Sequence, residues 1–253
     1  MLEEAREIAA VAADKARHYF RKPVRIEVKS DLSPVTEADR SIEDEVRALL
    51  ASKFPEHGIF GEEQGIEGGD RDEMWIVDPI DGTRSFMTGH PLFGFLLGHL
   101  HKGQPDVGVI CMPALEEVFS AKKGGPAELN GEEISCSGQT DLSEANIYIN
   151  EGERLYRDRP EVFERLLCVG KNRRLAFDCY PHALVAAGYV DAVIDYGLEP
   201  YDILPVCVVV EAAGGVMTDW SGNALDVRSR GAVVSAATPE LHAALLKVLN
   251  ETS

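Results

Sequence analysis

Apolar residues recur at helical spacing over residues 2–20, with charged residues between them, and this pattern predicts an amphipathic helix at the start of the chain. Residues 24–29 alternate between apolar and charged side chains, which predicts a strand, and residues 30–34 predict a turn. A second helix follows and stops near residue 54. Thr36 and Asp39 stand three apart at its start, which is the spacing of a capping pair.

Two short apolar stretches then end in acidic residues. Residues 58–61 and 74–78 each predict a buried strand, and a polar, glycine-rich loop over residues 65–72 separates them. Glu62 directly follows the first strand, and Asp78 ends the second. The two strands therefore place carboxylates at their C-terminal ends.

The pattern changes near residue 140. Before this point, strands over residues 93–100, 107–112 and 118–122 and a hairpin through Asn130-Gly131 predict an antiparallel meander. After it, strands and helices alternate: strand 147–149, helix 161–167, helix 181–187, strand 190–195, an apolar helix from about residue 201 to Gly214-Gly215, and strand 216–220. We therefore expect an N-terminal α+β domain over residues 1–140 and a C-terminal α/β domain over residues 141–253.

The composition is that of a folded globular protein, because 45% of the 253 residues are hydrophobic and 27% are charged. The 43 acidic side chains exceed the 25 basic ones, and the net charge of -18 argues against a nucleic acid or an anionic membrane as partner. The sequence contains no apolar run long enough to cross a bilayer, and its N-terminus lacks the pattern of a signal peptide. The five cysteines are scattered, so we expect a cytoplasmic protein with reduced thiols.

The densest chemical signal is the sequence Asp78-Pro79-Ile80-Asp81-Gly82-Thr83. The proline fixes the local backbone so that the two aspartates can converge, and the Ile80 carbonyl offers another hard oxygen ligand for a cation. The Gly82 and Thr83 amides, at the start of a possible helix, can hold a phosphate group. An ordinary turn is the competing interpretation. Glu62 and Asp202 are further carboxylates, although Asp202 can also serve as a helix cap.

Three ordered motifs resemble those of the inositol monophosphatase superfamily: Gly61-Glu62-Glu63, residues 75–83, and Tyr201-Asp202 followed by residues 211–215. The resemblance covers nearly the whole chain. It implies a layered αβαβα sandwich of mixed α+β and α/β character. It also implies magnesium-dependent, lithium-sensitive hydrolysis of phosphate monoesters, with two or three Mg2+ ions per active site, in a protein that is usually a homodimer.

The resemblance further implies a role for individual residues. The implied metal ligands are Glu62, Asp78, the Ile80 carbonyl, Asp81 and Asp202. Thr83 matches the residue that orients the attacking water, Asp39 matches its acidic partner, and Glu62 joins them in catalysis. The Gly82 and Thr83 amides are implied to bind the phosphate.

Residues 81–94 and 197–205 resemble the histidinol-phosphate phosphatase branch of this superfamily. Ser85 and Tyr201 stand where inositol phosphatases typically have Asn and Trp. Asp178 and Asp195 match substrate-pocket positions, and two acids there would attract the ammonium and imidazole of histidinol phosphate. Alternatively, Asp178 caps the following helix. Arg84 is expected to contact either the substrate or a neighbouring subunit, and Ser85 is expected to contact the substrate.

The expected function is therefore Mg-dependent hydrolysis of L-histidinol phosphate to L-histidinol and phosphate, as in histidine biosynthesis. Hydrolysis of inositol-1-phosphate or of a broad range of sugar phosphates is the alternative on the same metal centre. A regulatory binding protein of the same family is a further alternative. The intact set of implied catalytic and metal-binding residues argues against a purely non-catalytic role: Glu62, Asp78, Asp81, Thr83 and Asp202.

Overall fold

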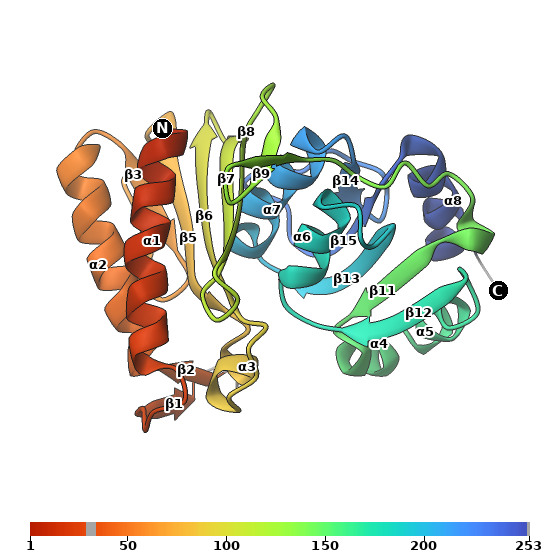
Figure 1. Ribbon diagram of the computed structural model, residues 1–253, viewed down its shortest axis with the longest axis horizontal. Coiled ribbons are helices and arrows are strands. Elements are labelled where there is room, and N and C mark those ends of the chain that lie inside the picture. The colour runs from red at the N-terminus through yellow and green to blue at the C-terminus, as the bar shows by residue number, and fades with distance from the viewer. Residues whose placement is uncertain (29–33, 252–253) are drawn as a thin grey trace.

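The computed structural model describes residues 1–28 and 34–251, so most of the turn expected at residues 30–34 lies outside the described residues. The described chain forms a larger sheet of eight strands, a smaller sheet of five strands, and an antiparallel hairpin of β1 (Ile26–Val28) and β2 (Pro34–Thr36). Helices lie between the two sheets and on their outer faces (Figure 1).

The larger sheet has the strand order β10-β9-β8-β7-β6-β5-β3-β4 and is antiparallel except where β3 pairs with β5. The expected meander is confirmed. The strand β4 occupies part of the segment expected to be a loop, and it pairs with β3. The sequence did not predict this strand because its side chains, including Ile66, are largely exposed and show no apolar pattern. The strands are β3 (Gly58–Gly61), β4 (Gly65–Glu67), β5 (Glu73–Asp81), β6 (Gly94–His101), β7 (Gln104–Met112), β8 (Glu117–Lys122), β9 (Ala127–Leu129) and β10 (Glu132–Ile134).

The smaller sheet has the order β12-β11-β13-β15-β14, with β11 parallel to both of its neighbours. The sequence pattern predicts neither β12 nor β15. Four of the five residues of β12 are exposed at the sheet edge, so this strand has no apolar face to detect. The strands are β11 (Asn146–Asn150), β12 (Asn172–Ala176), β13 (Ala192–Leu198), β14 (Val216–Asp219) and β15 (Gly231–Ala236).

The helices complete five layers in the order αβαβα, as expected (Figure 1). One face of the larger sheet is covered by α1 (Leu2–Tyr19) and α2 (Glu37–Lys53), and α6 (Tyr180–Ala186) and α7 (Pro200–Ala212) lie between the sheets. The outer face of the smaller sheet is covered by α4 (Gly152–Asp158), α5 (Pro160–Leu166) and α8 (Pro239–Asn250). A short helix α3 (Thr83–Met87) follows β5, and a 3-10 turn (Leu142–Glu144) precedes β11.

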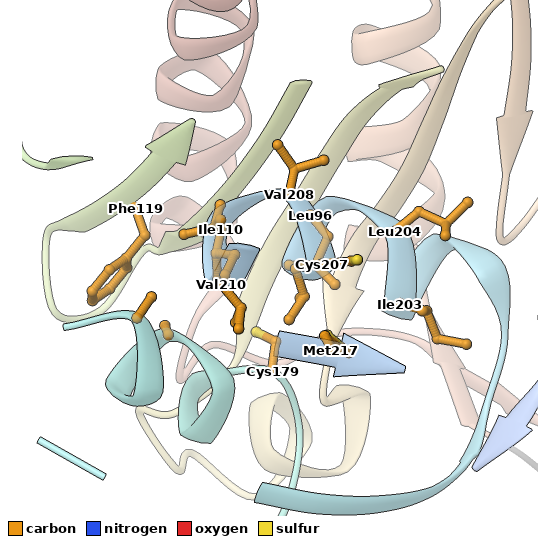
Figure 2. Close-up of a cluster of buried hydrophobic side chains, with 14 of the residues drawn as sticks. Leu96, Ile110, Phe119, Cys179, Ile203, Leu204, Cys207, Val208, Val210 and Met217 are labelled. Carbon is orange, nitrogen blue, oxygen red and sulfur yellow. The ribbon is translucent and has the colours of Figure 1, made fainter. Parts of the chain in front are cut away.

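Alternation of side chains explains why the larger sheet is buried on both faces. In β5, Trp75 and Val77 pack beneath α1 and α2, whereas Ile76 packs on the opposite face against α7. The helix α7 is apolar all round because both sheets pack on it. Figure 2 shows Leu96 and Ile110 of the larger sheet, the apolar residues of α7, and Met217 of the smaller sheet in this central core.

The domain boundary expected near residue 140 falls between β10 and β11, and therefore between the last strand of one sheet and the first strand of the other. However, α6 and α7 belong to the second half and contact both sheets. The two halves share one hydrophobic core, and their division into domains stays a prediction. Within the residues that the structure covers, none of the helices has the length and apolar character needed to cross a membrane.

Candidate active site

Two parallel strands bring the first acidic residues together. Because β3 and β5 run parallel with Gly61 opposite Val77, their C-terminal ends meet at the same edge of the sheet. The Glu62 N–H donates to the Val77 carbonyl at 3.1 Å, so this pairing continues one residue beyond β3. Glu62 therefore lies beside Asp78, as the sequence indicated.

An irregularity in β5 brings Asp81 to the same side as Asp78. Residues three apart in a regular strand face opposite sides of the sheet. Here the register against β6 shifts between Asp78, opposite Leu96, and Asp81, opposite Gly94. Two residues of β5 thus stand against one of β6, which is the arrangement of a β-bulge. The Ile80 N–H donates to Asp78 Oδ1 at 3.0 Å and fixes that side chain within the bulge.

The second half of the chain adds Asp202 from the first turn of α7. Its Oδ2 accepts the Glu199 N–H at 2.8 Å, so Asp202 does serve as a helix-capping residue, and this leaves its second oxygen for another partner. Asp78, Asp81 and Asp202 each offer an oxygen within 4.8 Å of those of the other two. Three of the five groups expected to act as metal ligands therefore lie together.

The close approach of these carboxylates has an electrostatic cost. Burial, followed by the charges of Glu62 and Asp81, raises the pKa of Asp78 well above its usual range. Burial also raises the pKa of Asp202 well above its usual range, with Asp81 the largest charge contribution. The pKa of Asp81 rises to about 6, again mainly through burial, and a hydrogen bond from Cys179 opposes this rise.

A divalent cation would relieve this repulsion. Among residues 1–28 and 34–251, no lysine, arginine or histidine forms an ion pair with Asp78, Asp81 or Asp202. Several hard carboxylate oxygens that converge without a basic partner are the donor set that Mg2+ and similar cations prefer. The residues present thus fit a metal ion.

Asp39 and Thr83 form the second expected pair. Asp39 is fully buried, and its Oδ2 accepts the Thr36 N–H at 2.9 Å, which confirms the capping pair at the start of α2. Its Oδ1 lies 3.2 Å from Thr83 Oγ1, and that hydroxyl is also 3.3 Å from the Ile80 carbonyl oxygen. Because the hydroxyl donates only one proton, its oxygen lone pairs stay available to accept a hydrogen bond from a water molecule.

Gly82 forms the junction between β5 and α3. Its φ of 86° lies in the left-handed region that favours glycine. A Cβ added there would lie 2.5 Å from both Cγ and Oδ2 of Asp178, so this position has no room for a side chain. The absent side chain lets Asp178 lie directly against the backbone that leads into Thr83.

A cavity of about 680 Å³ adjoins the acidic cluster. Glu62, Gly82 and Thr83 line its inner end, and Asp178 lines it as well. The remaining wall carries charges of both signs, and several of these come from α4, a helix that the sequence pattern did not predict. The residues of this wall are Pro34, Arg84, Glu151, Glu153, Arg154, Arg157 and Asp158. The α4 segment is short and mostly exposed, so it lacked a detectable apolar face.

The structure excludes one of the two roles considered for Asp178. The helix α6 begins at Tyr180 and its N-cap is Cys179, with no side-chain cap, so the interpretation of Asp178 as a helix cap is wrong. Instead, Asp178 has a φ of 62° and its Oδ2 accepts a hydrogen bond from Ser85 Oγ at 2.6 Å. Burial and then repulsion by Asp81 raise the pKa of Asp178 to about 8.

Three further residues expected to contact substrate differ in their placement. Arg84 is exposed and lines the cavity. Ser85 is buried and reaches the cavity only through Asp178. Asp195 does not line the cavity: it is 2% exposed, and its oxygens already accept hydrogen bonds from Asn150, His182 and the Tyr196 N–H. Direct contact between Asp195 and a substrate does not fit this position.

Comparison with known proteins agrees with this geometry. The chain matches the model of the inositol monophosphatase family over residues 1–253. It is 38% identical over 251 residues to a chloroplastic bifunctional phosphatase, IMPL2, of Arabidopsis thaliana, covering 96% of this chain and 72% of that protein. It is 36% identical over 236 residues to a histidinol-phosphatase of Chlorobaculum parvum, covering 92% of this chain and 90% of that protein.

A solved structure shows the same fold. The inositol monophosphatase from Zymomonas mobilis superimposes with a TM-score of 0.89 at 35% sequence identity, covering 99% of this chain and 97% of that chain. The parallel strands β3 and β5, the bulge between Asp78 and Asp81, and Asp202 on α7 therefore stand in a known architecture. The chain belongs to the inositol monophosphatase family and is a phosphatase of that metal-dependent superfamily.

Proposed function

We propose that this protein hydrolyses L-histidinol phosphate to L-histidinol and phosphate with the help of Mg2+. The observation that carries the substrate proposal is the position of Asp178, which Ser85 holds at the wall of the cavity beside Gly82. Although burial raises the pKa of Asp178 to about 8, a cation beside this carboxyl group stabilises its charged form. The position therefore favours a substrate whose alcohol part is cationic, and histidinol carries an ammonium and an imidazole. Glu151 lines the same cavity and adds a second acid. The relative from Chlorobaculum parvum bears the name histidinol-phosphatase.

The phosphate group would lie at the inner end of the cavity. There the Gly82 and Thr83 amides stand at the beginning of α3 and would donate to phosphate oxygens. Glu62, Asp78, Asp81, Asp202 and the Ile80 carbonyl would hold two or three Mg2+ ions. Bound Mg2+ would neutralise the phosphate charge and lower the pKa of a bound water.

The protein's own residues would position the attacking water. Asp39 accepts a hydrogen bond from the Thr83 hydroxyl, so the Thr83 oxygen can accept a hydrogen bond from that water. Glu62, at the cavity wall beside Asp78, would orient it from the other side. The new P–O bond forms from the water, which loses a proton, as the ester P–O bond breaks. The departing alkoxide takes up one proton from water, so the protons balance.

The test is phosphate release from L-histidinol phosphate and from myo-inositol 1-phosphate in parallel, each with Mg2+, with EDTA, and with added lithium. We expect a higher kcat/KM for histidinol phosphate, loss of activity in EDTA, and inhibition by lithium. A preference for the inositol ester would refute the substrate proposal and keep the metal-dependent chemistry. Release from neither ester would favour another phosphate ester or a regulatory binding role.

Hydrolysis of inositol-1-phosphate or sugar phosphates is the second candidate. It is favoured by the similarity to the Zymomonas mobilis inositol monophosphatase and by the arginines of the cavity wall, which suit neutral or anionic alcohols. Replacing Asp178 with Ala distinguishes the two candidates. For a histidinol phosphatase this change lowers kcat/KM for histidinol phosphate much more than for a plain aryl phosphate.

We also propose a cytoplasmic homodimer. All five cysteines are free thiols, which is typical of a reducing compartment. Large apolar side chains are exposed around the edge strand β12: Leu175 at 59%, Phe177 at 42% and Tyr189 at 72%. Exposed apolar side chains of this size favour contact with a second copy of the chain. Sedimentation equilibrium of the protein and of a Leu175→Asp variant tests this proposal, since the variant is expected to be monomeric.

A further inference from the structure

Four buried polar side chains form a continuous line through the second half of the protein. Ser235 Oγ lies 2.8 Å from His182 Nδ1, His182 Nε2 lies 3.1 Å from Asp195 Oδ2, and that oxygen accepts from Asn150 Nδ2 at 2.6 Å. All four residues are at most 2% exposed. They come from β15, α6, β13 and β11, so the line crosses three adjacent strands beneath the helix that packs on them (Figure 1).

The line ends at a single peptide group beside the active site. Asn150 Nδ2 also donates to the Asp178 carbonyl oxygen at 2.9 Å. The N–H of the same peptide group belongs to Cys179 and donates to Asp81 Oδ2. Because a peptide group is planar, holding its carbonyl oxygen also sets the direction of its N–H. Asn150 therefore controls the hydrogen bond that Asp81 receives.

The backbone at Asp178 is strained in this arrangement. Asp178 has a φ of 62°, a left-handed conformation that side chains larger than glycine rarely adopt. The amide of Asn150 supplies both of its protons to this arrangement, one to Asp195 and one to the Asp178 carbonyl. Its own Oδ1 is buried without a hydrogen-bond partner among the described residues. A buried acceptor left unsatisfied indicates that the two donated bonds are what this position requires.

We propose that Asn150, held in place by Asp195 and His182, is a positioning residue for the metal-binding carboxylate of Asp81. The Cys179 N–H occupies one oxygen of Asp81 and so fixes which oxygen faces the acidic cluster. Partners that orient a metal ligand in this way typically contribute 10- to 100-fold to metal affinity. This inference rests on the proposed metal site. It also gives Asp195 a role away from the substrate, consistent with its burial.

The test is Mn2+ binding by isothermal titration calorimetry, without substrate. We expect Asn150→Ala to raise the Kd for Mn2+ at least about 10-fold. The matched control is Ser235→Ala, which weakens the far end of the same line without touching the peptide group. It is expected to lower the melting temperature and to keep the Kd for Mn2+ within twofold. Amide hydrogen exchange gives a second readout, since exchange of the Cys179 N–H should accelerate in Asn150→Ala and not in Ser235→Ala.

An unchanged Kd in Asn150→Ala, or an equal loss of affinity in both variants, would overturn the proposal. If Asn150→Ala does not fold, Asn150→Ser is measured against the same two criteria. Asp81→Asn separates this proposal from the proposed function. If Asp81→Asn binds Mn2+ as tightly as the unaltered chain, the metal site itself is wrong, whatever the effect at Asn150.

Discussion

Replacing Gly82 with Ala tests how tightly the Asp178 side chain packs against the backbone at Gly82. The left-handed conformation at Gly82 costs a residue with a Cβ about 1–2 kcal/mol. The new Cβ would also lie 2.5 Å from two atoms of Asp178, which must move and give up its hydrogen bond from Ser85, at a cost of about 1 kcal/mol. We therefore expect Gly82→Ala to lower the free energy of unfolding by about 2–3 kcal/mol.

The assay is urea denaturation in EDTA, so that metal binding does not contribute. Gly131→Ala is the matched control, because Gly131 has the same φ of 86° and no atom within 4 Å of the new Cβ. It should lose only the conformational part, about 1–2 kcal/mol. In the double variant Gly82→Ala/Asp178→Ala the steric part should disappear, so the two changes should be non-additive. The reasoning is refuted if Gly82→Ala costs no more than Gly131→Ala.

Three further changes test the acidic cluster and the water-positioning pair. Asp202→Asn should lower kcat about 100-fold or more, through lost charge at the metal site. Urea denaturation in EDTA should show no loss of stability, because the cost of burying an acidic group beside Asp81 and Glu62 is gone. Melting temperatures of the metal-free protein should fall as the pH rises from about 4 to about 8, since the raised pKa values of Asp81 (about 6) and Asp178 (about 8) mean that the folded state binds more protons than the unfolded state. Asp178→Asn should reduce the part of this decline above about pH 6, to which Asp78 and Asp202 with their raised pKa values also contribute. Mg2+ should suppress the part due to Asp78, Asp81 and Asp202. Thr83→Val should lower kcat about 100-fold, because it removes the hydroxyl that donates to Asp39. Thr83→Ser should keep most of the kcat, and steady-state phosphate release measures both values.

The parts of the fold that the sequence predicts are those with a strong apolar period. The helices α1 and α2 and the strands β5 to β8 each bury one or both faces, so their patterns are clear. The strand β12 and the helix α4 escape prediction because most of their residues are exposed. The strand β4 escapes for the same reason, since Ile66 is 58% exposed. Edge strands and short surface helices form through backbone pairing and tertiary contact, which leave little trace in the pattern of residue types.

The acidic residues of the site are predictable because chemistry restricts their type. Carboxylates at strand ends and in the sequence from Asp78 to Thr83 stand out, and their convergence needed only the parallel pairing of β3 with β5 and the bulge in β5. The assignment of Asp195 fails for a geometric reason. An aspartate on a buried strand can face either a cavity or neighbouring side chains, and Asp195 faces the side chains of Asn150 and His182.

The groups that restrain the acids were invisible in the sequence because they are backbone amides. The Cys179 N–H holds Asp81, and the Glu199 N–H holds Asp202, and any residue type except proline could supply either bond. Both amides come from the second half of the chain, as does Glu151 at the cavity wall. The same metal-binding residues can therefore be combined with different cavity-lining residues. Motifs that identify the metal site do not identify the alcohol part of the substrate. Relatives of similar identity accordingly bear different names, and the proposal that specificity lies at Asp178 and Glu151 can be tested with variants of this chain.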